Sequence, residues 1–324
     1  MRGGRCVGDG STSFMQTKDA AYCLRRWGYR RFLTRLQRAR HLPPLLWTFP
    51  GAGNTWLRML LDYSTGIYTG SIYGDPSLIP LLPGEGRCDR SVVAVKAHPS
   101  HIDSFDFVPD GSGLLRFNVT RKPQYAKCEP LRFISAIVVV RDPYRSIWAE
   151  YKRHVNWREL VVGRPLGSES TSVMCRRALR SQSLHSGGML RDCFDAPTFH
   201  RHALRLARSW KHSWFHYGRF RALQHARLLQ VSYEDLTDAS NRGAVLRGMV
   251  DFVGMQTRVT DEALRCAFTL ADNPHIHRKV AGSGAQVATI DDAYANHTVV
   301  CLMWQLFRRK ALKTGYRPFG NTDC

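Results

Sequence analysis

Residues 47–61 read WTFPGAGNTWLRMLL, and the interpretation of the whole chain starts from this stretch. The apolar run Leu45–Phe49 leads into the turn PGAGN, and a helix-like pattern, TWLRMLLDY, follows it. Such a strand–turn–helix unit aims backbone N–H groups and the positive end of a helix dipole at one point. Thr55 adds a hydroxyl donor beside that point. The stretch therefore predicts a loop that binds a phosphate or a sulfate.

This loop differs from the ATP-binding cradle GxxxxGK[ST]. No Lys-Ser or Lys-Thr pair follows the glycines, so no hydroxyl is placed for Mg²⁺. A nucleotide or small-molecule kinase is therefore disfavoured. The missing lysine also leaves open which group supplies positive charge to the anion; Lys96 and Arg58 are the candidates.

Three further apolar runs read as buried strands: Val92–Lys96, Ile134–Val140 and Leu228–Val231. Continuous hydrophobicity is typical of parallel strands that are covered on both faces. A helical pattern follows the third of the four runs, with Asp142 as the expected N-cap and Pro143 in the first turn. The repeated order of strand, loop and helix predicts an α/β fold with a central parallel sheet flanked by helices.

The ends of the chain differ from this middle part. Residues 1–44 form a polar, then strongly basic arm, in which Leu24–His41 places seven arginines in a loosely helical rhythm. Such a segment could lie on a membrane or a polyanion, or pack on the domain by its apolar side. We expect a domain over residues 45–319 and a short tail over 320–324, with a last helix at Tyr294–Lys313.

Composition restricts the partners. The 324 residues carry a net charge of +21, which implies acidic ligands or a generally basic surface. The sequence shows no apolar window long enough to span a membrane and no secretory signal. Nine scattered cysteines form no CxxC pair and no zinc spacing, so no metal site is expected. Sequons at Asn118 and Asn296 would suit a secretory compartment.

The stretch VVAVKAHPS contains a second candidate site. Lys96 and His98 come at the carboxyl end of a predicted strand, the edge where α/β sheets bind ligands. Alternation places both side chains on one face. A fixed cation beside a group that titrates near neutrality suits proton removal from an acceptor hydroxyl. A surface lysine next to a structural histidine is the alternative.

Four motifs in order, TFPGAGNTWLRMLL, VKAHPS, IVVVRDPYRSIWAEY and VSYEDL, resemble the sulfotransferases that use 3′-phosphoadenosine 5′-phosphosulfate (PAPS). The stretch GNTWLRMLLDYSTGIYTGSIY is most similar to the sulfotransferase domain of the WSC-domain-containing family. This resemblance runs from about Leu45 to Pro318. It implies a P-loop-NTPase-like three-layer fold, with PAPS as sulfuryl donor and no metal.

The resemblance also assigns site residues. His98 would be the base and Lys96 a catalytic cation, Arg141 would hold the 3′-phosphate, and Tyr233 would lie beside the adenine. The residues that would bind the donor through the first loop and a late basic loop are Gly51, Ala52, Gly53, Asn54, Thr55, Trp56, Arg278 and Lys279.

The chain departs from the family at two positions. Many soluble relatives have a lysine at the place of Gly51, and the wider superfamily has a serine where this chain has Ala149. Ser146, nearer the start of the helix, is the candidate substitute for that hydroxyl. We expect acceptor contacts in the segment His154–Trp210.

The expected function is sulfuryl transfer from PAPS to a hydroxyl acceptor, with carbohydrate as the implied acceptor class. The alternative is a catalytically silent protein of the same fold that binds a nucleotide or a polyanion. No specific nucleic-acid partner is expected, and membrane association would come only from the basic arm or from an anchor outside this sequence. The resemblance implies the Golgi lumen, and the cytoplasm is the alternative.

Overall fold

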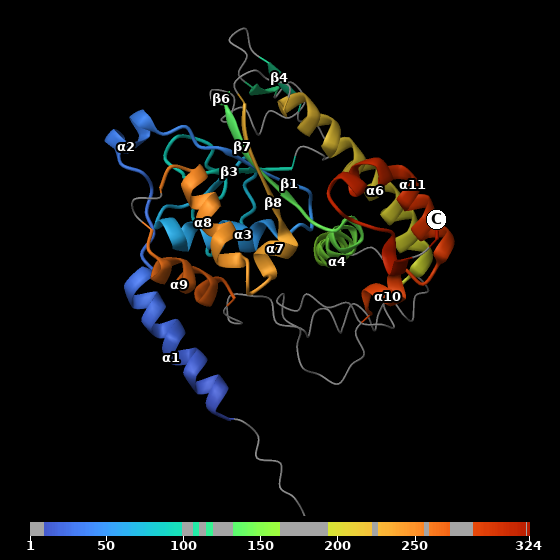
Figure 1. Cartoon of the computed structure of the whole chain (residues 1–324), viewed down its shortest axis with the longest axis horizontal. Coiled ribbons are helices and arrows are strands. Elements are labelled where there is room, and N and C mark those ends of the chain that lie inside the picture. The colour runs from blue at the N-terminus through green and yellow to red at the C-terminus, as the bar shows by residue number, and fades with distance from the viewer. Residues whose placement is uncertain are drawn as a thin grey trace, which may run out of the picture.

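A sheet of five parallel strands forms the centre of the protein in the computed structural model (Figure 1). The strand order is β2–β3–β1–β7–β8. The strands are β1 (Leu45–Thr48), β2 (Gly70–Ser71), β3 (Val95–Ala97), β7 (Ser135–Val140) and β8 (Arg227–Ser232). The four predicted apolar runs are confirmed as the strands β1, β3, β7 and β8, with shifted bounds, but the prediction that Leu228–Val231 is buried is wrong, because β8 is an edge strand in which only Val231 is buried. The short strand β2 has no apolar run and was not predicted.

The structure describes residues 10–98, 106–109, 115–118, 132–162, 194–221, 226–255, 259–272, 288–321 and 323–324. Beside the central sheet, a second, antiparallel sheet contains β4 (Asp106–Pro109), β5 (Leu115–Asn118) and β6 (Arg132–Phe133). The helices are α1 (Gly10–Trp27), α2 (Arg35–Arg40), α3 (Asn54–Thr65), α4 (Pro143–Val162), α6 (Ala196–Arg221), α7 (Tyr233–Thr237), α8 (Arg242–Phe252), α9 (Asp261–Ala271), α10 (Ile290–Ala293) and α11 (His297–Lys313), and a 3₁₀ turn covers Phe319–Asn321.

Helices cover both faces of the parallel sheet, which gives the predicted three-layer α/β fold. Side chains of β1 alternate, so that Leu46 joins the core under α3, α8 and α9, whereas Leu45 and Trp47 join the core under α4, α6 and α11. Ile137 and Val138 of β7 divide in the same way. Because β1 and β7 are buried on both sides, their sequences are continuously apolar rather than alternating, whereas the edge strand β8 is only partly buried.

The basic arm is not one helix, and the helical interpretation of Leu24–His41 is wrong in its middle. The backbone N–H of Arg31 donates to Gly66 O at 3.0 Å, and Arg31 O accepts from Tyr68 N at 3.0 Å. These bonds hold the chain extended between α1 and α2, because a helical residue would use the same groups within its own helix. Leu33 is buried nearby, so this part of the arm packs on the domain.

Two complete disulfides tie peripheral elements together. Cys23 of α1 bonds to Cys266 of α9, and Cys301 of α11 bonds to Cys324. Cys88 is also disulfide-bonded. Within the described part of the chain, no helix combines the length and the apolar character that crossing a membrane requires.

The carboxyl ends of β1, β7 and β8 lie at one edge of the sheet because the strands are parallel. β1 leads into α3, β7 into α4 and β8 into α7. The predicted N-cap of α4 is confirmed, since the Arg145 N–H donates to Asp142 Oδ1 at 2.8 Å. Three helix starts therefore meet where ligands bind in α/β sheets.

Candidate anion-binding site at the carboxyl edge of the sheet

The loop between β1 and α3 has the form that its sequence predicts. Gly51 and Gly53 have φ angles of 82° and 81°, in the left-handed region that favours glycine. Gly53 is the N-cap of α3 and has no side chain to accept a hydrogen bond. Leu57 N–H already donates to Gly53 O, whereas the N–H groups of the preceding residues in the first turn have no intrahelical acceptor. The loop therefore presents backbone donors at the positive end of the helix dipole.

Close packing explains why position 51 carries no lysine. A Cβ atom at Gly51 would lie 2.1 Å from the carbonyl oxygen of Ser146 and 3.0 Å from the backbone nitrogen of Glu150, both in α4. A Cβ atom at Gly53 would lie 2.3 Å from the ring of Tyr233. With this backbone the loop accepts only glycine at these two positions, so any side-chain charge must come from neighbouring elements.

Arg141 directly follows β7, and its side chain contacts both the β1–α3 loop and Tyr233, the residue after β8. Its Nη1 donates to Gly51 O at 2.7 Å, and its guanidinium carbon lies 4.2 Å from the ring centroid of Tyr233. Its Nε is buried and has no hydrogen-bond partner within the described part of the chain. A buried donor of a cation without an acceptor is unusual, and it fits a group that receives an anion.

The His98 side chain is hydrogen-bonded to Thr48, the last residue of β1. Its Nδ1 lies 2.7 Å from Thr48 O, a carbonyl that can only accept, so Nδ1 carries the proton and donates. In the neutral ring the lone pair is then on Nε2. The Asn54 side chain donates to Thr48 Oγ1 at 2.8 Å, and the His98 backbone N–H donates to the Tyr73 hydroxyl at 2.9 Å. A base at position 98 would thus be held directly beside the loop.

Lys96 is buried next to this histidine. Burial first, and then the charge of Arg58, lower the pKa of Lys96 to about 8. Its Nζ lies 5.2 Å from the ring centroid of Tyr73, the same tyrosine that contacts His98. Arg58, the other candidate source of charge for the loop, is fully buried and forms an ion pair with Glu85. Lys96, rather than Arg58, is therefore the cation that accompanies His98.

Two cations of α4 were missed by sequence analysis. Arg153 forms an ion pair with buried Glu150, whose backbone approaches Gly51, and Arg153 also contributes to the lowered pKa of Lys96. The pKa of Lys152 is lowered, first by burial and then by the charge of Arg141. Their spacing along α4 was a usable signal, because residues three and four apart share a helix face with Ala149.

The remaining predicted residues fall into three groups. Trp56 lies edge-on to Tyr233 with ring centroids 5.8 Å apart, and Ala52 and Asn54 are buried in the loop. Ser146, the proposed substitute for the missing serine, is fully buried, and its Oγ has no hydrogen-bond partner among the described residues. Arg278 and Lys279 lie outside the described residues, as does much of the predicted acceptor segment.

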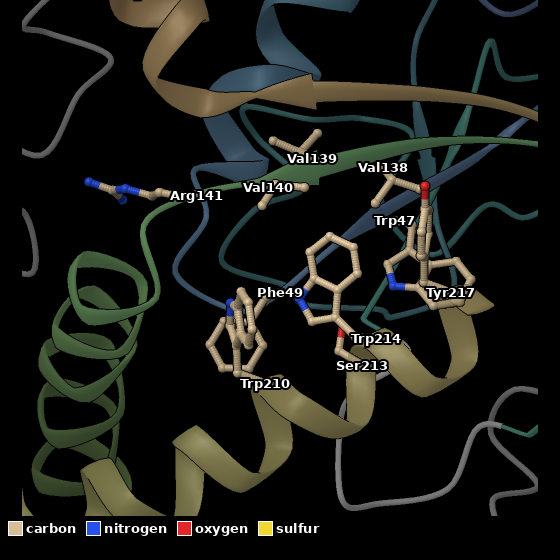
Figure 2. A pocket seen from close by; sticks show the side chains of 10 residues that line it. All are labelled: Trp47, Phe49, Val138, Val139, Val140, Arg141, Trp210, Ser213, Trp214 and Tyr217. Atoms are coloured by element: carbon tan, nitrogen blue, oxygen red, sulfur yellow. The ribbon is translucent and has the colours of Figure 1, made fainter. Parts of the chain in front are cut away.

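A pocket lies on the α6 side of the sheet, next to the loop. Figure 2 shows Trp210, Trp214 and Tyr217 of α6 turned toward Trp47 and Phe49, while the guanidinium of Arg141 points away from these rings. The aromatic wall and the cationic group thus occupy different sides of the same strand ends. The arrangement offers apolar contact beside an anion site.

Comparison with known proteins gives a partial match. No protein-family model matches the chain. Over about a third of its length, the chain is homologous to members of the WSCD family. It is 38% identical over 115 residues to the WSCD family member CG9164 of Drosophila melanogaster, which is 35% of this chain and 28% of that protein.

Two other relatives match to the same degree. The WSCD family members GA21586 of Drosophila pseudoobscura pseudoobscura and AAEL009094 of Aedes aegypti are each 38% identical over 107 residues, which is 33% of this chain and 26% of either protein. The chain thus spans about a quarter of the length of the curated relatives that it matches. These matches agree with the resemblance to the WSC-type proteins seen in the sequence.

The glycine requirement gives a first prediction. We expect Gly51→Ala to lower the free energy of unfolding by about 3 kcal/mol or more, because left-handed strain adds to an overlap with α4. Gly66→Ala is the matched control: it has a φ of 66°, but its Cβ would find its nearest atom at 3.6 Å, so it should cost about 1 kcal/mol. Urea unfolding measures both. A Gly51→Lys variant as stable as the wild type would contradict this packing argument.

Proposed function

We propose that this chain transfers a sulfuryl group from PAPS to a hydroxyl acceptor, with a carbohydrate as the acceptor class. The observation that carries the proposal is the contact of Arg141 with both Gly51 and Tyr233, beside the start of α3 and the anchored His98. Four motifs distant in sequence thereby meet at one edge of the sheet. The homology to the WSCD proteins and the resemblance to sulfotransferases support the same assignment.

The donor set fits a nucleotide that is anionic at two places. The N-terminus of α3 offers backbone N–H groups to a phosphosulfate, and Arg141 together with Lys152 offers charge to a 3′-phosphate. Trp56 and Tyr233 offer ring surfaces to an adenine. When bound, PAPS supplies an activated sulfuryl group on a phosphate leaving group.

In this proposal His98 removes the proton of the acceptor hydroxyl. The proton on Nδ1 is directed to Thr48 O, so Nε2 is the nitrogen that accepts. The hydrogen bond also fixes the ring, which keeps the base in one orientation without further cost during the reaction. Lys96 and Arg153 stabilise the negative charge that develops next to the loop, in place of a loop lysine.

A silent nucleotide-binding protein of the same fold is the second candidate. Ala149 provides no hydroxyl at the superfamily's serine position, and the side chain of Ser146 is fully buried. These two features favour a lower affinity for a 3′-phosphate than in relatives that have the serine. Binding without turnover would identify this function, so binding and turnover are measured separately below.

Isothermal titration with 3′-phosphoadenosine 5′-phosphate tests the binding part. We expect binding by the wild type and a loss of at least about tenfold in Arg141→Ala, because a charge-assisted contact is removed. Arg145→Ala is the control, since Arg145 lies one turn further on the exposed side of α4. Turnover with PAPS and a panel of glycans should fall about 10²- to 10⁴-fold in His98→Ala. Wild-type protein that does not bind the nucleotide would refute the proposal.

The lowered pKa of Lys96 gives a pH prediction. Because its pKa is about 8 rather than 10.5, the ammonium is charged below pH 8 and loses its charge above it. We therefore expect kcat to decline as the pH rises from 7.5 to 9.5. Lys96→Arg keeps its charge throughout this range and should remove the decline, even if its kcat is lower. An identical decline in this variant would show that Lys96 is not the group responsible.

The disulfides support a location in the secretory pathway, and we propose the Golgi lumen. The disulfide bonds of Cys23, Cys88 and Cys301 are typical of proteins in an oxidising compartment, which supports this proposal. Asn296 is exposed at the start of α11, where its side-chain oxygen accepts from Val299 N–H at 3.3 Å. A glycan on its amide nitrogen would leave that cap in place.

Glycosylation provides the test of this location. Protein expressed in animal cells should lose mass on deglycosylation, and Thr298→Ala should remove the Asn296 share of that loss. This substitution keeps the Asn296 cap, whereas changing Asn296 itself would also weaken the helix. Protein without any glycan in such cells, recovered with free thiols at Cys23 and Cys266, would argue for the cytoplasm.

A further inference from the structure

The outer faces of α6 and α11 are basic and lack compensating acids. α6 has 26 residues and α11 has 17, and neither contains an aspartate or a glutamate. Arg221 at the end of α6 is exposed, and the other exposed cations described in the two helices, which we call the α6–α11 basic face, are Arg201, Arg205, Arg208, Lys211, Arg308, Arg309 and Lys313. Within the described part of the chain, none of them forms an ion pair. The α6–α11 basic face therefore carries positive charge that no described acidic side chain neutralises.

The arginines of α6 form a straight row. Arg201, Arg205 and Arg208 follow the i, i+4, i+7 spacing, and His212 continues the row, which spans about 16 Å along the helix. The opposite side of α6 contributes its apolar residues to the core, Trp210 among them. The row therefore points to solvent along its whole length.

The two helices lie side by side (Figure 1), and the arginine row is on the side of α6 that faces away from α11. Phe199 contacts Tyr294 just before α11, with ring centroids 5.2 Å apart, and Trp210 contacts Phe307 further along at 5.4 Å. The contact that is later in the sequence of α6 is also the later one in the C-terminal segment, so the two helices run in the same direction. The cations of α11 after Phe307 are thus at the level of the cations of α6 around Trp210.

The fold does not need these charges. Like charges at i, i+4 destabilise a helix, and among the described residues Arg201 and Arg205 donate to local acceptors, Thr198 Oγ1 and the ring of His202. Other exposed arginines of this chain do have an acidic partner, as in the ion pair between Arg247 and Asp261. Arginines that oppose helix stability and form no ion pair with the described residues are suited to an external polyanion.

We propose that the arginine row of α6 binds a linear polyanionic glycan, one that carries sulfate or carboxylate groups along its length. Among the described side chains of α6, no large apolar group is exposed beside the row for insertion into a membrane. The same described side chains include no exposed aromatic ring on which a base could stack. Disulfides are typical of the oxidising compartments in which such glycans occur. This site is independent of PAPS and lies outside the anion-binding loop.

Fluorescence anisotropy with a labelled heparin-derived dodecasaccharide tests the proposal without PAPS. The variant R201Q/R205Q/R208Q is compared with R35Q/R40Q/R265Q, which removes the same charge from exposed arginines of α2 and α9. At 0.15 M salt we expect the first variant to lose about tenfold or more in affinity, and its slope of log K against log salt to fall by about two to three. The control should change less than about threefold.

Three outcomes would overturn the proposal. Equal losses in the two variants would mean that net charge, and not the arginine row, attracts the glycan. Tighter, row-dependent binding of a single-stranded DNA oligomer would assign the row to nucleic acid instead. Row-dependent binding to phosphatidylserine vesicles, at an affinity above that for the dodecasaccharide, would assign it to membranes. Thermal melting of both variants confirms that each is folded.

Discussion

The contact between the β1–α3 loop and α4 is the constraint on which the candidate site depends. At Gly51 the loop comes so near to the backbone of Ser146 that no side chain fits between them. The same close approach lets Arg141 reach Gly51 O, and Gly53 approaches Tyr233 as closely. A loop fixed by backbone contacts on two sides presents its N–H groups in one arrangement, which favours recognition of an anion by a pre-formed site.

This constraint also determines where positive charge can come from. A lysine is excluded at positions 51 and 53 of the loop, so side-chain charge has to come from neighbouring elements, and Lys96 of β3 and Arg153 of α4 are the candidates. The cost is visible in the lowered pKa of Lys96, which is buried near other cations. Arg58, in contrast, is paired with Glu85 inside the core. The chain thus contains a structural arginine that is distinct from Lys96 and Arg153.

The sequence predicted the parts of the fold that depend on local pattern. Leu45–Phe49 and Ile134–Val140 were recognised because strands buried on both faces are continuously apolar, and Asp142 because a helix start needs a cap. The two-residue strand β2 was missed because it has no hydrophobic pattern, and Arg153 because its role depends on a contact between α4 and the loop. The extended segment at Arg31 was misread because its pairing with Ile67 is tertiary.

Glu234 shows how the geometry of Arg141 is maintained from a distance. In the VSYEDL motif only Tyr233 was expected to belong to the site, yet Glu234 Oε1 accepts from the backbone N–H of Asp142 at 3.0 Å. Its Oε2 accepts from the Tyr316 hydroxyl at 2.7 Å. One carboxylate therefore joins the end of β7, the start of α7 and the C-terminal segment. Because Arg141 and Asp142 are adjacent, fixing the backbone of Asp142 also fixes the direction from which Arg141 reaches Gly51. The candidate site is thus held by side chains that would not touch a ligand, and their contribution could be recognised only once the fold was known.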